Sequence, residues 1–129
     1  LTEVKLGLIP AVISPYVVAA IGEKKARRYF LTGERFSAAD AVGFGLLNAS
    51  VAPDDLDQAV QAMIDMLMIP GPVAQAEAKD LIASVAHRPL TDSVVADTAE
   101  RIAHIRISPE GQEGLAAFLE KRSPGWLKK

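Results

Sequence analysis

The sequence has no cysteine, and only 5% of its 129 residues are aromatic. The absence of cysteine excludes disulfide bonds and thiolate metal sites within this chain. With so few aromatic residues, a core must be built mainly from Ala, Val, Leu, Ile and Met, which favours helices over a β-sandwich. Half of the residues are hydrophobic, so a chain of this length can enclose a core.

The sequence also lacks a strong net charge and a long apolar run. A formal net charge of -2 predicts no long-range attraction to nucleic acid or to an anionic membrane. No apolar run approaches the roughly 20 residues that span a bilayer, and no basic leader precedes an apolar stretch. We therefore expect no nucleic-acid partner, no membrane association and a cytoplasmic location. The chain starts at Leu1 rather than Met, which suggests an excised or processed segment.

Residue types that carry common chemistries are also scarce. The two histidines, His87 and His104, have no cysteine or clustered carboxylate at ligand spacing, so we predict no metal site. No glycine-rich phosphate loop stands between a strand and a helix. Ser14 and Ser108 each precede a proline, which favours helix caps rather than nucleophiles. Residue patterns alone thus predict a helical domain without naming a reaction.

Apolar spacing and helix-end signals predict a mainly helical chain with at most one or two short strands. We expect Leu1–Pro10 to be extended or loop, and Leu46–Ala52 is the best strand candidate. A further helix is expected to begin at Pro53, with an apolar stripe of Leu56, Val60, Met63, Ile64 and Leu67. The other expected helices cover Pro15–Ile21, Glu23–Leu31, Ser37–Gly43, Val73–Val85 and Thr91–Ile107.

The expected helix ends have specific chemistry. Ser37 and Asp40 resemble a capping box with Asp in place of Glu. Ser108, followed by a proline, predicts the start of a final helix with Leu115, Phe118 and Leu119 on one apolar face. Lys121 and Arg122 are expected to close that helix, because cations are favourable at its negative end.

Three stretches of the sequence form a recognisable set. They are Thr2–Pro10 (TEVKLGLIP), Leu31–Ala41 (LTGERFSAADA) with Gly43 and Gly45 after it, and Ser108–Arg122 (SPEGQEGLAAFLEKR). Together they resemble the enoyl-CoA hydratase/isomerase family of the crotonase superfamily. The first looks like the family stretch that carries a catalytic glutamate before Leu-Gly-x-Ile-Pro, the second is similar to the next family stretch, and the third resembles the terminal helix. The three stretches follow the family order and together span almost the whole chain.

This resemblance implies a fold. The chain would be the C-terminal half of an enoyl-CoA hydratase-like domain, that is, the helical part of a crotonase α/β spiral fold. Residues 1–129 would form a single segment, with 1–52 ending the spiral core and 53–129 forming a helical oligomerisation region. By the same resemblance we expect a homo-oligomer, a trimer or a hexamer.

The resemblance also implies a reaction, the addition of water to a 2,3-enoyl-CoA thioester by a lyase. Glu3 would be one of two catalytic glutamates and would act as a general acid or base. The second glutamate, and the backbone amides that stabilise the enolate oxygen, would lie before Leu1, so the active site would be incomplete in this chain and the chain inactive by itself. The alternative is that Glu3 is a solvated terminal carboxylate.

Phe118 and Lys121 stand where relatives contact the adenine and phosphate end of coenzyme A. A lysine is suited to a phosphate, toward which it acts as a point charge. The alternative is that Phe118 belongs to the core and Lys121 only complements the helix dipole. Coenzyme A is part of the acyl-CoA substrate, so no separate cofactor is implied.

One departure from the family pattern concerns the substrate. After Ile-Pro, most hydratases of the family are glycine-rich, whereas this chain has Ala11–Pro15 (AVISP). This variant resembles methylglutaconyl-CoA hydratases, which act on a branched, acidic enoyl thioester in the breakdown of leucine or terpenoids. Two other functions stay open: a helical association module, and a crotonase-family isomerase.

Overall fold

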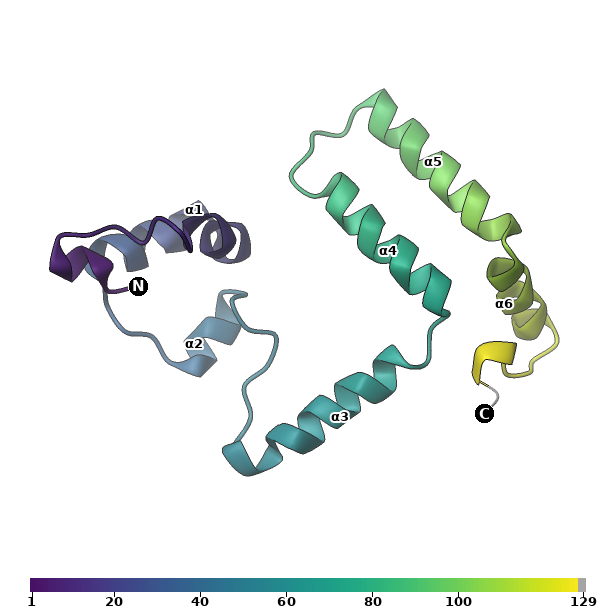
Figure 1. The fold of residues 1–129 in the computed structure, drawn as a ribbon, viewed down its shortest axis with the longest axis horizontal. Coiled ribbons are helices and arrows are strands. Elements are labelled where there is room, and N and C mark those ends of the chain that lie inside the picture. Colours follow the sequence, from purple (N-terminus) through teal and green to yellow (C-terminus); the bar gives the residue numbers. More distant parts are fainter. Residues whose placement is uncertain (128–129) are drawn as a thin grey trace. The chain divides into compact units, whose positions relative to one another are not determined.

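The computed structural model describes residues 1–127, and its regular structure there is entirely helical (Figure 1). The contacts between residues group into two compact units, one of Leu1–Ala59 and one from Val60 onward. The α-helices are α1 (Ser14–Thr32), α2 (Ala38–Gly43), α3 (Leu56–Leu67), α4 (Pro72–Val85), α5 (Asp92–Ile107) and α6 (Pro109–Leu119), and short 3-10 turns cover Glu3–Leu6, Pro53–Asp55 and Gly125–Leu127.

In the first unit, α1 consists of two helical segments that meet at Gly22. This glycine has φ 73° and ψ 161°, a conformation in which a residue with a Cβ would be strained. The break agrees with the two helices predicted on either side of Gly22. The small core lies on α1, where Val17, Ile21, Ala26 and Tyr29 are buried.

An aromatic cluster of Tyr29, Phe36 and Phe44 lies between α1 and α2. The ring centroids of Tyr29 and Phe36 are 4.9 Å apart, and those of Phe36 and Phe44 are 5.1 Å apart, both in edge-on geometry. The predicted capping box is confirmed, because Ser37 Oγ accepts from the Asp40 amide while Asp40 Oδ2 accepts from the Ser37 amide, each at 3.0 Å. The cap fixes the start of α2.

The strand expected over Leu46–Ala52 is wrong. This stretch is irregular, and the amides of Leu46 and Leu47 both donate to the carbonyl of Ala41, which closes the end of α2. A strand needs a neighbouring strand to satisfy its backbone groups, and residues 1–127 provide none. The apolar composition of this stretch therefore is not sufficient to make it a strand.

Two details at the amino-terminal end also differ from expectation. Within the stretch expected to be loop, Glu3–Leu6 forms a 3-10 turn. Ser14 is not an N-cap: it is the first residue of α1, and its Oγ donates to the carbonyl of Ala11 at 2.8 Å. A serine bonded to a preceding carbonyl has turned its hydroxyl away from the helix amides.

Helix α3 follows the turn at Pro53, as predicted, but its apolar stripe is uncovered. Val60, Met63 and Ile64 are 49%, 49% and 44% exposed, and α3 has no buried residue. Such a stripe is stable in water only where another surface can cover it.

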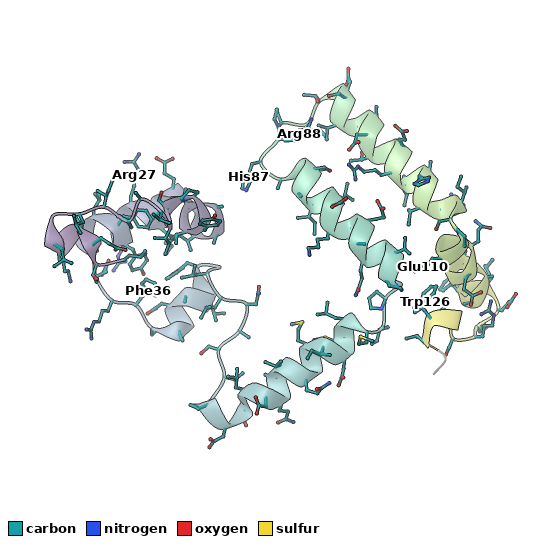
Figure 2. The ribbon with its side chains drawn as sticks, in the orientation of Figure 1. Arg27, Phe36, His87, Arg88, Glu110 and Trp126 are labelled. Atoms are coloured by element: carbon teal, nitrogen blue, oxygen red, sulfur yellow. The ribbon has the colours of Figure 1, made fainter. Side chains whose placement is uncertain are left out.

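In the second unit, α4, α5 and α6 contact one another. The break predicted at Pro70-Gly71-Pro72 precedes α4, and the two helices expected after it are present with nearly the predicted bounds. Glu110 of α6 joins the helices: its carboxylate accepts from the amides of Val73 and Ala74 at 3.0 and 2.8 Å (Figure 2). The start of α4 is thus capped by a residue distant in sequence.

The corner between α5 and α6 is very close-packed. Ser108 caps α6, as predicted, by accepting from the amide of Gly111 at 3.0 Å. A Cβ placed on Gly111 would lie 2.2 Å from the carbonyl oxygen of Ile105, which is far inside van der Waals contact. Any residue larger than glycine at position 111 would therefore prevent α5 and α6 from packing this closely.

The end of α6 corrects another prediction. The helix ends at Leu119, so Lys121 and Arg122 lie beyond it and do not form its last turn. Arg122 instead turns back to Glu113 and Glu120, and the indole of Trp126 donates to the carbonyl of Ile69 at 3.1 Å. Positions 128 and 129, the end of the helical region expected over 53–129, lie outside the described residues.

Within residues 1–127, each helix is too short or too polar to cross a membrane. The same residues contain no group of three or more His, Cys, Asp or Glu side chains arranged to hold a metal ion.

Candidate active site

Glu3, the predicted catalytic residue, opens the 3-10 turn Glu3–Leu6 in the first unit. Its side chain is 37% exposed, and its Oε2 is 4.0 Å from the amino group of Leu1. That oxygen is itself buried and accepts no hydrogen bond within the described chain. A buried carboxylate oxygen without a donor is uncommon, and it can accept a proton or a hydrogen bond from a group that enters the site.

An apolar hollow of about 270 Å³ opens beside the same turn. Val4, which follows Glu3, contributes to its wall, and Ser14 is the only polar residue there. The Ser14 hydroxyl is already bonded to Ala11, so the wall offers apolar contact. The hollow is lined by Val4, Leu8, Ile9, Pro10, Ala11, Ser14, Phe30 and Leu31.

Phe118 and Lys121 lie together at the end of α6, in the second unit. The Lys121 amide donates to the Phe118 carbonyl at 3.2 Å, and the Phe118 side chain is 80% exposed. Phe118 is therefore not a core residue of this unit, and that alternative is wrong. Lys121, with φ 55°, follows the end of the helix and does not extend its last turn.

The predicted residues fall into two groups. Glu3 and the hollow belong to the first unit, whereas Phe118 and Lys121 belong to the second. The histidines join neither group: His87 lies in the turn after α4 with φ 60° (Figure 2), and His104 is exposed on α5.

Arg122 and Glu113, which the sequence analysis did not connect, make the most extensive side-chain contacts near the second group. Two guanidinium nitrogens of Arg122 donate to the two oxygens of Glu113 at 2.6 and 2.9 Å. The hydrogen bonds that Arg122 donates to Glu113, followed by the one that it donates to Glu120, raise the pKa of Arg122 above its ordinary value. The two residues are nine positions apart, so the usual helical spacing rule could not pair them.

Comparison with known proteins establishes the family. Residues 1–129 match the model of the enoyl-CoA hydratase/isomerase family, and the chain belongs to that family. This confirms the family resemblance found in the three sequence stretches.

Solved structures of enoyl-CoA hydratases are similar to this chain. A crystal structure of an enoyl-CoA hydratase from Shewanella pealeana is 52% identical, has a TM-score of 0.89 and covers 98% of this chain with 47% of its own. An enoyl-CoA hydratase structure from Mycobacterium smegmatis is 33% identical, with a TM-score of 0.90, and covers 98% of this chain with 49% of its own.

Curated relatives agree with the structures. A probable enoyl-CoA hydratase of Mycobacterium tuberculosis is 33% identical over 124 residues, which are 95% of this chain and 48% of the relative. A carnitinyl-CoA dehydratase of Salmonella typhi is 25% identical and covers 98% of this chain with 50% of its own length. The chain thus spans about half the length of the curated relatives it matches.

Proposed function

We propose that this chain supplies one catalytic carboxylate, Glu3, to an enoyl-CoA hydratase whose remaining groups come from polypeptide outside residues 1–129. The single observation that carries the proposal is the buried Oε2 of Glu3, which accepts no hydrogen bond within the described chain and lies beside an apolar hollow. An acid–base residue for a thioester with an aliphatic tail needs this combination of an available oxygen and an apolar wall. Membership of the family supports the reaction class.

In this reaction, a base removes a proton from water and the water oxygen bonds to the β-carbon. The electrons of the double bond move toward the thioester oxygen, and a proton is then delivered to the α-carbon. The product is a 3-hydroxyacyl thioester, and water is the only other reactant. Glu3 would perform one of the two proton transfers, and a second carboxylate the other, while backbone donors stabilise the enolate oxygen.

The test is Glu3→Gln in the active preparation that contains this chain, assayed by hydration of crotonyl-CoA. The amide keeps the size of the side chain but cannot exchange the proton, so kcat should fall by about 10²- to 10⁴-fold. Glu100→Gln, at an exposed acid on α5, is the matched control and should leave kcat unchanged. A Glu3 variant within a factor of about two of the control would remove this residue from the mechanism.

A branched enoyl group is the finer proposal for the substrate. It is supported by Ala11–Pro15, which replaces the glycine-rich stretch of most relatives and places Ala11 and Ser14 in the wall of the hollow. No charged residue is among those that line the hollow, so the carboxylate of an acidic acyl group would need a cation from outside it. Relative kcat/KM for crotonyl-CoA, 3-methylcrotonyl-CoA and 3-methylglutaconyl-CoA would rank these substrates.

A second candidate function is association through helices. The uncovered stripe of α3 favours it, because Leu56, Val60, Met63, Ile64 and Leu67 are all at least 44% exposed and a second surface would bury them. Sedimentation at several concentrations tests this proposal, which expects a homo-oligomer such as a trimer or a hexamer. A monomer at every concentration would contradict it.

Isomerisation is the second activity that the description of the family names. An isomerase would use the same carboxylate to move a proton between carbons of a 3-enoyl-CoA without adding water. Product analysis separates the two reactions, because only hydration incorporates oxygen from labelled water.

A further inference from the structure

The turn between α3 and α4 is built as a hinge. It contains Pro70, Gly71 and Pro72, and neither proline has an amide hydrogen with which to close the turn. Their rings also fix φ at both positions, whereas Gly71 between them has no Cβ and therefore the widest conformational freedom. The chain can bend at Gly71, and α3 joins α4 through this single flexible point.

Packing does little to fix this hinge. A hollow of about 220 Å³ lies beside it, with Gly71 on its wall together with Gly111 and Gly114 of α6 and the side chain of Trp126. The space next to the turn is thus not filled by side chains, and α3 itself has no buried residue. The direction in which α3 leaves the turn therefore depends on a few specific contacts.

Two side-chain hydrogen bonds cross the hinge. Gln75 Nε2, in the first turns of α4, donates to the carbonyl of Leu67 at the end of α3, at 2.6 Å. The indole Nε1 of Trp126 donates to the carbonyl of Ile69 at 3.1 Å, from 57 residues away (Figure 2). Because Trp126 lies outside both helices, the second bond ties the end of α3 to a separate part of the unit.

The indole is held in place by its own neighbours. A Cβ on Gly114 of α6 would lie 3.1 Å from Trp126 Cη2, so the ring rests where this helix has no side chain. Just before the ring, the Gly125 amide donates to Glu113 at 2.7 Å. The guanidinium of Arg122 donates to both oxygens of the same carboxylate, at 2.6 and 2.9 Å. The segment that carries Trp126 is therefore fastened to α6.

We propose that the indole N–H of Trp126 is a latch that closes the hinge at Gly71 and sets the direction of α3 relative to α4, α5 and α6. One hydrogen bond contributes little compared with the whole fold, so the latch can open while the helices stay folded. The apolar stripe of α3 lies on the arm that the latch holds. Release of the latch would therefore change where that stripe is presented.

The experiment measures the distance between α3 and α5 by pulsed electron spin resonance. The chain has no cysteine, so Ala62→Cys and Glu100→Cys, at exposed positions, provide unique sites for two spin labels. Dilution with unlabelled chain restricts the measurement to distances within one chain, which should show one main distance. Trp126→Phe keeps an aromatic ring but has no N–H donor. It should raise the ratio of displaced to closed conformers about fivefold, the factor for one net hydrogen bond.

Two further variants serve as controls. Gln75→Ala removes the other side-chain bond across the hinge and should also increase the displaced conformers. Leu119→Ala shortens a side chain that is 78% exposed at the end of α6, and it should leave the distance distribution unchanged. Thermal unfolding by circular dichroism separates an open hinge from lost structure, because Trp126→Phe should still unfold in one cooperative transition.

Three results would overturn the proposal. The first is an unchanged distance distribution in Trp126→Phe, whatever Gln75→Ala does, because the indole N–H would then hold nothing. The second is a broad distribution in the labelled chain with Trp126 intact, since the hinge would then be open already. The third is the loss of cooperative unfolding in Trp126→Phe, which would make the indole a requirement of the fold rather than a latch.

Discussion

The clearest stability prediction concerns Glu110, which caps α4 from another helix. The first residue of α4 is Pro72, which has no amide hydrogen, and the Gln75 amide already bonds to the Gly71 carbonyl at 2.9 Å. Within the first turn of α4, the amides of Val73 and Ala74 are therefore left without a backbone partner. Glu110 accepts from both of them, so Glu110→Ala removes the whole cap.

The expected cost follows from these contacts. Loss of a cap costs about 0.5–2 kcal/mol in proteins, and this cap is a carboxylate at the positive end of the helix, which adds a favourable interaction. We expect a loss near 1.5 kcal/mol, toward the upper part of that range. For a unit of this size, such a loss lowers Tm by roughly 6–12 °C.

Thermal unfolding followed by circular dichroism measures the shift, and amide hydrogen exchange locates it. Exchange should accelerate at Val73 and Ala74, whose amides lose their acceptor. Glu100→Ala, at an exposed acid on α5, is the control and should change Tm little. An unchanged Tm, together with unchanged exchange at Val73 and Ala74, would refute the reasoning.

Two further predictions concern acid sensitivity and association. The pKa of Glu34 is lowered by its hydrogen bond from Arg28, and the pKa of Asp40 is lowered by its hydrogen bonds from the Ser37 hydroxyl and amide. Their contribution to stability is therefore present above the ordinary values of 4.5 and 3.8 and is lost as pH falls through the lower folded values. Tm should decrease on acidification below about pH 4, less steeply in Ser37→Ala, and a Tm that stays constant down to pH 2 would contradict this. Ile64→Lys places a charge on the uncovered stripe of α3 and should lower the association measured by sedimentation without lowering Tm; unchanged association would show that this stripe is not the contact.

Local chemistry explains why most helices were predictable. Ser37 with Asp40, and Ser108 before Pro109, form caps from residues only a few positions apart, so their signals are visible in a short window. Proline positions fixed the breaks around Pro53 and Pro72 in the same way. Helical periodicity is likewise a property of neighbouring residues.

The features that were missed depend on the path of the chain. Glu110 bonds to amides 36 and 37 residues away, and no local pattern indicates that pairing. The strand expected over Leu46–Ala52 failed for the related reason that a strand depends on a partner. The choice of Glu3, Phe118 and Lys121 came from family resemblance rather than from periodicity, and their roles stay predictions.

The tight corner at Gly111 has a consequence for mutational scanning. A survey of random substitutions should find this position intolerant even to alanine, because the Ile105 carbonyl occupies the space that a methyl group needs. Lost turnover there would reflect a helix pair that cannot close, with no bearing on proton transfer. Intolerance in such a survey therefore identifies a reacting group only where the altered protein still folds.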